Sequence, residues 1–350
     1  MNSNVGHVGG RQFVTLYELY CAALRESLEV AANSYLQLLA PHIKEVESAS
    51  GDDDVLASYC QRMRKLLERK GLMTNGESVG EFAQVFGEAH FAKLCKDRGI
   101  QLERIKAQKD RKTPDFRYGN PNPTAHFEVK TLSIVNGGRG IEADLLRALD
   151  AQIEIEQQLK KGARIATSVS EMQPYGGRGY QHGAITVVLS TLIEKSRQNI
   201  KPDQFIGKST FLVLNLCLIP PAITDNRALR PAYCDDYLFL KAVTGELWML
   251  AFSKPGMLIH GQPEFEGKPC LEGVTEKLGI LEDPEYLSIA GILIVVYPLG
   301  FNPRIYGLYR RSDYSRWLDE DEELVSLLQA IVGEQWNDSR DSNGWQLAGE

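Results

Sequence analysis

The segment 119–123, Gly-Asn-Pro-Asn-Pro, constrains the fold of this chain more than any other feature. Its two prolines lack backbone N–H donors and hold φ near one value, so no helix can continue through it. Residues 113–118 before it and 125–132 after it have the composition of strands. The sequence therefore predicts two strands that are joined by this turn and pair as a hairpin.

The other elements follow from the spacing of apolar residues. Helical spacing predicts five helices, at 13–39, 55–70, 77–98, 141–161 and 320–335, and Pro41 is expected to end the first run. Short apolar runs predict further strands at 100–105, 163–168, 184–190, 210–218, 236–243, 246–252, 289–297 and 304–310. Helix, three strands, helix and then more strands predicts an α/β fold built on a mixed sheet.

These elements divide the chain into four expected parts. They are a helical N-terminal region at 1–76, a core at 77–218, a β-rich extension or second domain at 219–317, and an acidic C-terminal helix and tail at 318–350. The pattern leaves open whether the β-rich part extends the first sheet or forms its own.

The distribution of charge is more informative than the net charge of −7. Residues 318–350 hold nine acids and one base, so the rest of the chain sums to +1, and 93–112 holds eight bases against three acids. A basic segment in a nearly neutral body is compatible with a phosphate-bearing partner. The acidic tail and the helical N-terminal region could dock a protein partner or a second copy of the chain.

Several classes of protein are not supported by the sequence. The longest apolar run, 289–297, is far shorter than the ~20 residues of a membrane span, and the N-terminus lacks the features of a signal peptide. We therefore expect a cytoplasmic protein without membrane contact, whose six scattered cysteines are reduced. No phosphate-binding loop, dinucleotide fingerprint or serine-hydrolase elbow is present.

Three residues around the turn can perform chemistry together. Alternate side chains of a strand share a face, so Glu128 and Lys130 point the same way, and the hairpin brings Asp115 beside them. Two carboxylates, helped by the backbone carbonyl of Val129, can hold Mg²⁺, which prefers hard oxygen ligands. A lysine beside the metal can orient or deprotonate a water, so the set suits hydrolysis of a phosphodiester.

The order Pro114-Asp115, then Glu128-x-Lys130, after a helix that carries a glutamate, resembles the PD-(D/E)xK nuclease superfamily. The resemblance covers about residues 77–218 and implies a restriction-endonuclease-like mixed sheet flanked by helices. It implies a nuclease that uses Mg²⁺ or Mn²⁺ and acts on DNA rather than RNA, as in a defence or restriction system. The implied catalytic residues are Asp115, Glu128, Lys130 and Glu88, with Asp115, Glu128, Glu88 and the Val129 carbonyl as metal ligands.

Two questions stay open at this point. The helix 77–98 offers both Glu81 and Glu88, and Glu88 is preferred because its place about three turns before Gly99 resembles that of the family's glutamate. Gln152 or Gln157, on the following helix, is a candidate for the supporting glutamine that some members of the family carry. A protein with this fold could also serve as a binding or assembly subunit without turnover. The intact carboxylates and lysine favour the enzyme, because a non-catalytic subunit has no chemical need for them.

Overall fold

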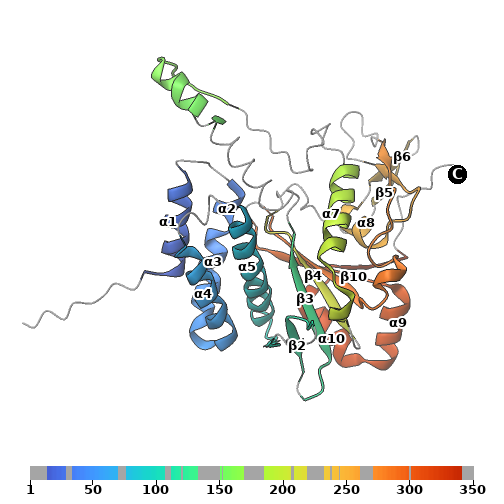
Figure 1. The fold of residues 1–350 in the computed structure, drawn as a ribbon. Helices are drawn as coiled ribbons and strands as arrows, with labels where there is room; N and C mark the ends of the chain where they lie inside the picture. The colour runs from blue at the N-terminus through green and yellow to red at the C-terminus, as the bar shows by residue number, and fades with distance from the viewer. Residues whose placement is uncertain are drawn as a thin grey trace, which may run out of the picture.

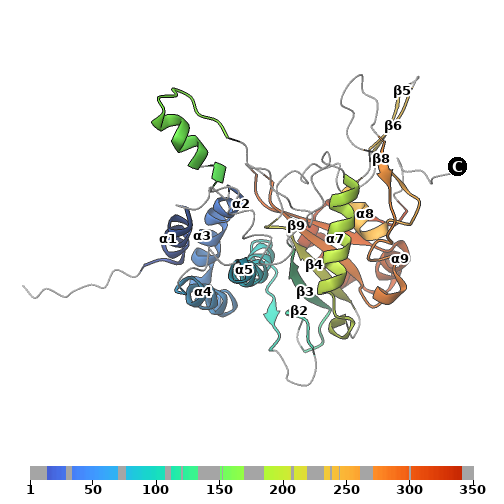
Figure 2. The ribbon, with the colours of Figure 1, turned by 45° about the horizontal axis from the view of Figure 1, so that its top comes forward.

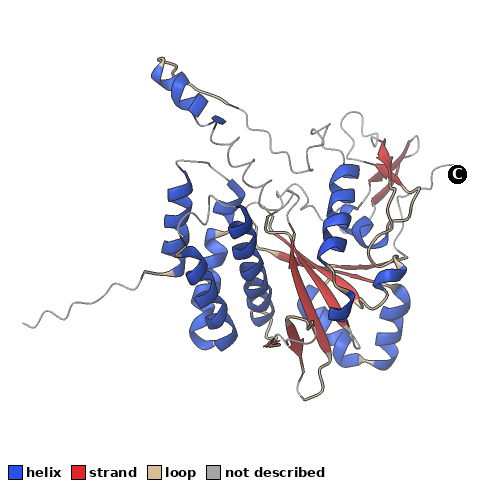
Figure 3. Ribbon diagram, in the orientation of Figure 1, coloured by secondary structure: helices blue, strands red, loops and turns tan. Residues whose placement is uncertain are grey.

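A seven-stranded sheet organises the chain in the computed structural model (Figures 1 and 3), and a mixed α/β fold is confirmed. The structure describes residues 14–28, 34–69, 76–106, 112–119, 121–132, 150–151, 153–168, 185–205, 209–218, 232–236, 239–243, 245–260, 271–298 and 301–340. In spatial order the strands are β1 (Glu103–Arg104), β2 (Phe116–Tyr118), β3 (Ala125–Thr131), β4 (Thr210–Asn215), β9 (Gly291–Val296), β10 (Arg304–Tyr309) and β11 (Trp336–Asp338).

The sheet mixes parallel and antiparallel pairs, with parallel strands at its centre and antiparallel strands at the edge formed by β1 and β2. β3, β4 and β9 run parallel, β1–β2, β2–β3 and β9–β10 pair antiparallel, and β10–β11 pair parallel. Every residue of β4 and β9 is buried, as expected for strands whose two faces are both covered. Two separate hairpins add β5 (Ala232–Asp236) with β6 (Phe239–Val243), and β7 (Leu258–His260) with β8 (Leu271–Val274).

Helices cover both faces of the sheet (Figures 1 and 2). They are α1 (Leu16–Leu28), α2 (Ser34–Leu38), α3 (Ala40–Ala49), α4 (Asp54–Leu67), α5 (Gly76–Lys96), α7 (Ile185–Asn199), α8 (Glu246–Phe252), α9 (Arg311–Glu320) and α10 (Glu322–Val332), with short 3₁₀ turns at Ser50–Asp52, Pro202–Phe205 and Pro284–Tyr286. One hydrophobic core joins α1, α3, α4, α5, α9 and α10 to the sheet face of Phe127 and Val129. The second core joins α7 and α8 to the face of Leu212 and Leu214.

α5 lies between the N-terminal helices and the sheet, and its residues 82–92 are almost all buried. Gly87 allows this close approach, because a Cβ at that position would collide with Oγ1 of Thr131 on β3 and lie 3.3 Å from Cγ of Asn215. The helix that carries Glu88 is therefore held directly against the strand that carries Glu128.

The N-terminal part contains more helices than the sequence predicted. Within the helix expected at 13–39 the structure describes α1 and α2, and residues 13 and 29–33 lie outside the described part. Pro41 lies in the first turn of α3 rather than ending a helix. Proline is tolerated there because the first N–H groups of a helix have no intrahelical partner. Of the helix expected at 141–161, residues 141–149 and 152 lie outside the described part, and 153–160 are helical.

Three expected strands were wrong. Residues 184–190 fall mostly in α7 and 246–252 form α8, while 163–168 adopt no regular structure. Short apolar runs rich in β-branched residues do not distinguish a buried strand from a buried helix.

The sheet crosses the boundaries expected near 218 and 317. β9 and β10 from the β-rich part, and β11 from the acidic part, join the same sheet as β3 and β4. Leu324, Leu328 and Ile331 of α10 are buried in the first core, so the acidic segment as far as 340 belongs to the fold. Within the described ranges, no helix combines the length and hydropathy that a membrane crossing requires.

Candidate functional site

The candidate site lies at the edge of β3, just before the first residue of the short strand β2. Phe116 of β2 pairs with Phe127, and the preceding residue, Asp115, still donates its backbone N–H to the Phe127 carbonyl at 3.0 Å. The Asp115 carboxylate then accepts the backbone N–H of Val129 at 2.8 Å. The hairpin predicted from the 119–123 turn thus places Asp115 directly beside β3. Its carboxylate makes the hydrogen bond to β3 that the backbone of a longer β2 would otherwise make.

The next stretch of this edge is covered by α5 through Gln84. Its amide nitrogen donates to the Val129 carbonyl at 2.9 Å and to Oε1 of Glu88 at 3.1 Å. Its amide oxygen accepts the backbone N–H of Thr131 at 2.9 Å. One glutamine therefore caps the exposed edge of β3 and fixes Glu88, which is buried and also lies 3.5 Å from Nη1 of Arg62.

Glu128 and Lys130 share the strand face that is directed toward the second core. Glu128 is 1 % exposed; its Oε1 pairs with Nζ of Lys130 and accepts the side-chain amide of Gln204 at 2.5 Å. Its Oε2 is buried and has no hydrogen-bond partner among the described residues. Gln204 comes from the 3₁₀ turn Pro202–Phe205 that follows α7.

Burial and the neighbouring carboxylates raise the pKa of Asp115 and of Glu128. Burial, together with the nearby Glu88 and Glu128, holds the pKa of Asp115 well above its usual range. Burial also raises the pKa of Glu128, although Lys130 opposes the shift. The pKa of the buried Tyr59 hydroxyl is raised by desolvation and then by Glu88. The site thus concentrates more negative charge than its own lysine balances.

The donors suit a divalent cation in chemistry but not in spacing, because within the described ranges Glu88, Asp115 and Glu128 do not form a group whose ligand atoms all lie within 4.8 Å of one another. The buried Oε2 of Glu128 lacks a partner, and an unpaired buried carboxylate oxygen is costly. Oxygen donors from Glu88, Asp115 and Glu128 are the hard ligands that Mg²⁺ and Mn²⁺ accept. The Val129 carbonyl, the fourth expected ligand, already accepts the Gln84 amide, but a carbonyl oxygen has a second lone pair.

Basic side chains surround the carboxylates. Lys112 and Lys201 are exposed, and the pKa of Lys201 is lowered mainly by the ammonium of Lys112 beside it and raised slightly by Glu128. The guanidinium carbons of Arg62 and Arg104 lie 5.4 Å and 4.8 Å from the ring centre of Tyr59. Two adjacent ammonium groups repel each other, so an anion bound between them would be stabilised.

Gln84 and Gln204 belong to the site but were not predicted from the sequence. Three other predicted candidates, Glu81, Gln152 and Gln157, are not placed at the site. Glu81 points away and forms an exposed ion pair with Arg69 at 2.9 Å, so Glu88 is the glutamate of α5 at the site. Gln157 is exposed, and Gln152 lies outside the described residues. Gln84 had a signal, because it precedes Glu88 by one helical turn, whereas nothing near Gln204 indicated its role.

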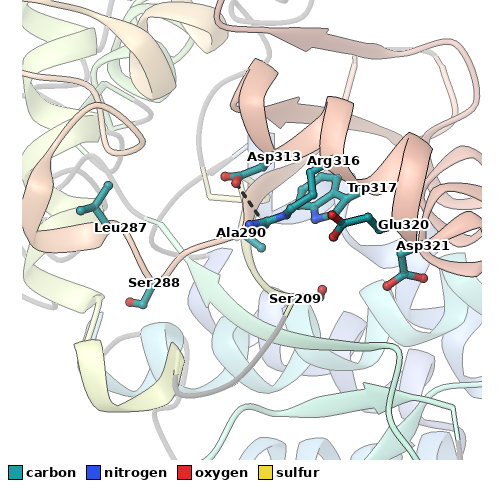
Figure 4. A pocket seen from close by; sticks show the side chains of 9 residues that line it. All are labelled: Ser209, Leu287, Ser288, Ala290, Asp313, Arg316, Trp317, Glu320 and Asp321. Atoms are coloured by element: carbon teal, nitrogen blue, oxygen red, sulfur yellow. Dashed lines mark hydrogen bonds and ion pairs between the residues drawn. The ribbon is translucent and has the colours of Figure 1, made fainter.

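A separate pocket of about 440 Å³ opens at the starts of β4 and β9 beside α9 (Figure 4). It is lined by Ser209, Leu287, Ser288, Ala290, Asp313, Arg316, Trp317, Glu320 and Asp321. In the described part of the chain, none of the carboxylates at the edge of β3 lines it. Asp313 pairs with Arg316 at 3.2 Å, so the remaining lining is acidic and does not suit a phosphate.

No protein family, curated protein or solved structure matches this chain in the three comparisons made. The chemistry of the protein therefore has to be inferred from the residues at the edge of β3 themselves.

Proposed function

We propose that this protein is a metal-dependent nuclease with a restriction-endonuclease-like fold, which hydrolyses phosphodiester bonds of DNA. One observation carries the proposal: Glu88, Asp115 and Glu128 lie near one another at the edge of β3, with Lys130 paired to Glu128 and one buried Glu128 oxygen left without a partner among the described residues. Paired carboxylates next to a lysine are the groups that metal-assisted hydrolysis of a phosphodiester requires.

Each residue has a separate task in the proposed reaction. Glu88, Asp115 and Glu128 hold Mg²⁺, for which Mn²⁺ can substitute. When bound, the ion supplies Lewis-acid polarisation of the phosphoryl group and lowers the pKa of a bound water. Lys130 is paired with Glu128 in the structure and is therefore positioned to orient the attacking water. To accept the proton that the water releases, Lys130 would first have to be in its neutral amine form.

The two glutamines act as positioning residues. Gln204 donates to Oε1 of Glu128, so Oε2 would remain available to a metal ion. Gln84 holds Glu88 and the backbone of β3 at Val129 and Thr131 in one arrangement. Both keep the carboxylates in place before metal binds, which reduces the reorganisation that binding would otherwise require.

The basic side chains around the site support a polyanionic substrate. Lys112, Lys201, Arg62 and Arg104 can each neutralise a phosphate, and affinity from such contacts falls steeply with salt. DNA is proposed over RNA from the resemblance to the nuclease superfamily. A binding or assembly subunit without turnover is the alternative that the experiment must separate.

The proposal is tested by cleavage of labelled single- and double-stranded DNA and RNA, with Mg²⁺, with Mn²⁺ and with chelator. Lys130→Gln keeps a donor for Glu128 but cannot accept a proton, so we expect cleavage to fall by about 10²–10⁴-fold while Mg²⁺ binding persists. Asp115→Asn should lose both cleavage and metal affinity. Lys160→Gln, at an exposed lysine on a distant helix, should behave as wild type.

Two results would remove the proposal. Cleavage that survives in Lys130→Gln and Asp115→Asn belongs to a contaminant or to another site. A wild-type protein that binds nucleic acid but cleaves none of the substrates with either metal is the binding subunit.

A further inference from the structure

A second cluster of metal-ligating side chains lies between α3 and α5, which pack side by side among the N-terminal helices (Figures 1 and 2). His42 and Glu45 are one turn apart on α3, and His90 lies on α5. Each offers one ligand atom, and the three atoms lie within 4.8 Å of one another. We propose that His42, Glu45 and His90 bind a zinc ion that links α3 to α5.

His90 is the strongest evidence for this site. Its side chain is completely buried, and its Nδ1 lies 2.8 Å from the hydroxyl of Tyr297. Its Nε2 is also buried and has no hydrogen-bond partner in the part of the chain that the structure describes. A buried ring nitrogen without a partner is costly, and Nε2 is the nitrogen that Tyr297 leaves available to a ligand.

The surroundings of Nδ1 of His90 are those typical of a metal-bound histidine. A ligating imidazole donates its second N–H to an oxygen, which fixes its tautomer and orientation. The Tyr297 hydroxyl oxygen can accept Nδ1–H, and it also accepts the side-chain amide of Asn215 at 3.0 Å. That amide is oriented in turn, because its oxygen accepts the backbone N–H of Cys217 at 3.0 Å.

The donor set favours zinc over magnesium. Two imidazoles and one carboxylate are typical zinc ligands and leave a fourth position for water, whereas Mg²⁺ prefers oxygen alone. Nδ1 of His42 already lies 3.3 Å from Oε2 of Glu45. The Lys93 ammonium is 3.5 Å from that Glu45 oxygen but 2.7 Å from Asp97, so Glu45 can turn to the metal while Lys93 stays with Asp97.

The site is tested by equilibrium dialysis of the untagged, full-length protein against ZnCl₂ after treatment with chelator, with bound metal counted by mass spectrometry. Wild type should bind one zinc ion per chain at this site. His42→Gln and Glu45→Gln should lose it, and Glu68→Gln, at the exposed residue that follows α4, should retain it. Lys93→Met should bind zinc severalfold more tightly, because it removes a positive charge beside Glu45.

Two further measurements separate metal binding from other effects. Zinc should raise the thermal unfolding temperature of wild type but not of His42→Gln. Each protein is compared with itself in chelator, because the variant also loses the ring contacts of His42 with His90 and Tyr297. Asp115→Asn should keep this zinc, so the result is independent of the proposed nuclease. The inference is overturned if wild type binds no zinc, or if both α3 variants bind as much as wild type.

Discussion

Replacing Gln84 by glutamate isolates the contact that joins α5 to the edge of β3. The amide nitrogen of Gln84 donates to the Val129 carbonyl at 2.9 Å and to Glu88 at 3.1 Å. An ionised carboxylate of the same size can still accept the Thr131 N–H, but it has no hydrogen to donate and faces two oxygens. A protonated carboxyl can still donate one hydrogen bond, so Gln84→Glu should be tolerated at low pH and destabilising at neutral pH.

The size of the effect follows from proton linkage. Because the folded state favours the neutral form, the pKa of the introduced carboxyl should rise above its unfolded value of about 4.3. A group with a raised folded pKa contributes stability that is present below its unfolded pKa and is lost as pH rises. The loss is about 1.4 kcal/mol per pH unit until the folded pKa is reached, which sets a limit of about 3.7 kcal/mol at pH 7.

Urea unfolding in the presence of chelator, at intervals between pH 4.5 and pH 7, measures the difference in stability between Gln84→Glu and wild type. Gln157→Glu makes the same change at an exposed helical position and should show a small difference that does not vary with pH. A flat difference for Gln84→Glu across this range would show that Gln84 does not hold α5 to β3 as described.

Two further predictions concern the same edge. In chelator, Asp115→Asn should be more stable than wild type at pH 7, because the raised pKa of Asp115 makes its ionised form costly in the folded protein. Urea unfolding should show that this gain in stability shrinks toward pH 4. A variant that is less stable than wild type at pH 7 would contradict the prediction. Gly87→Ala should destabilise the protein by about 1–3 kcal/mol, because the added methyl group collides with Thr131, although alanine favours a helix. On the same helix, the methyl group of Gly80→Ala meets nothing within 4 Å, so this variant should be more stable by up to about 1 kcal/mol. Thermal unfolding of both variants measures the two effects.

The elements that could be predicted from the sequence were those set by local chemistry. Two prolines in the 119–123 turn predicted the β2–β3 hairpin, and the two-residue period of a strand predicted that Glu128 and Lys130 share a face. Glu88 was preferred over Glu81 on another ground, because its place on the helix resembles that of the glutamate in the nuclease superfamily. The hairpin and the shared face depend on covalent geometry and backbone periodicity, which follow directly from the sequence.

What could not be predicted depends on contacts between distant parts of the chain. Gln204 meets Glu128 across 76 residues, and nothing in the turn that carries it indicates this contact. The run at 184–190 is apolar and β-branched, yet 185–190 belong to α7, whose Leu189, Leu192 and Ile193 lie in the second core with residues of β4 and β9. The membership of β9, β10 and β11 in one sheet likewise depends on pairing between segments far apart.

The way in which Asp115 is positioned affects which changes of chain length the protein can tolerate. Because Asp115 is placed by the pairing of β2 with β3, one residue inserted within either strand would turn the following side chains to the opposite face. The same insertion in the turn at 119–123, beyond the paired residues, would leave the carboxylates where they are. Related sequences should therefore vary in length at this turn while keeping the spacing between Asp115 and Tyr118, and between Ala125 and Lys130, unchanged.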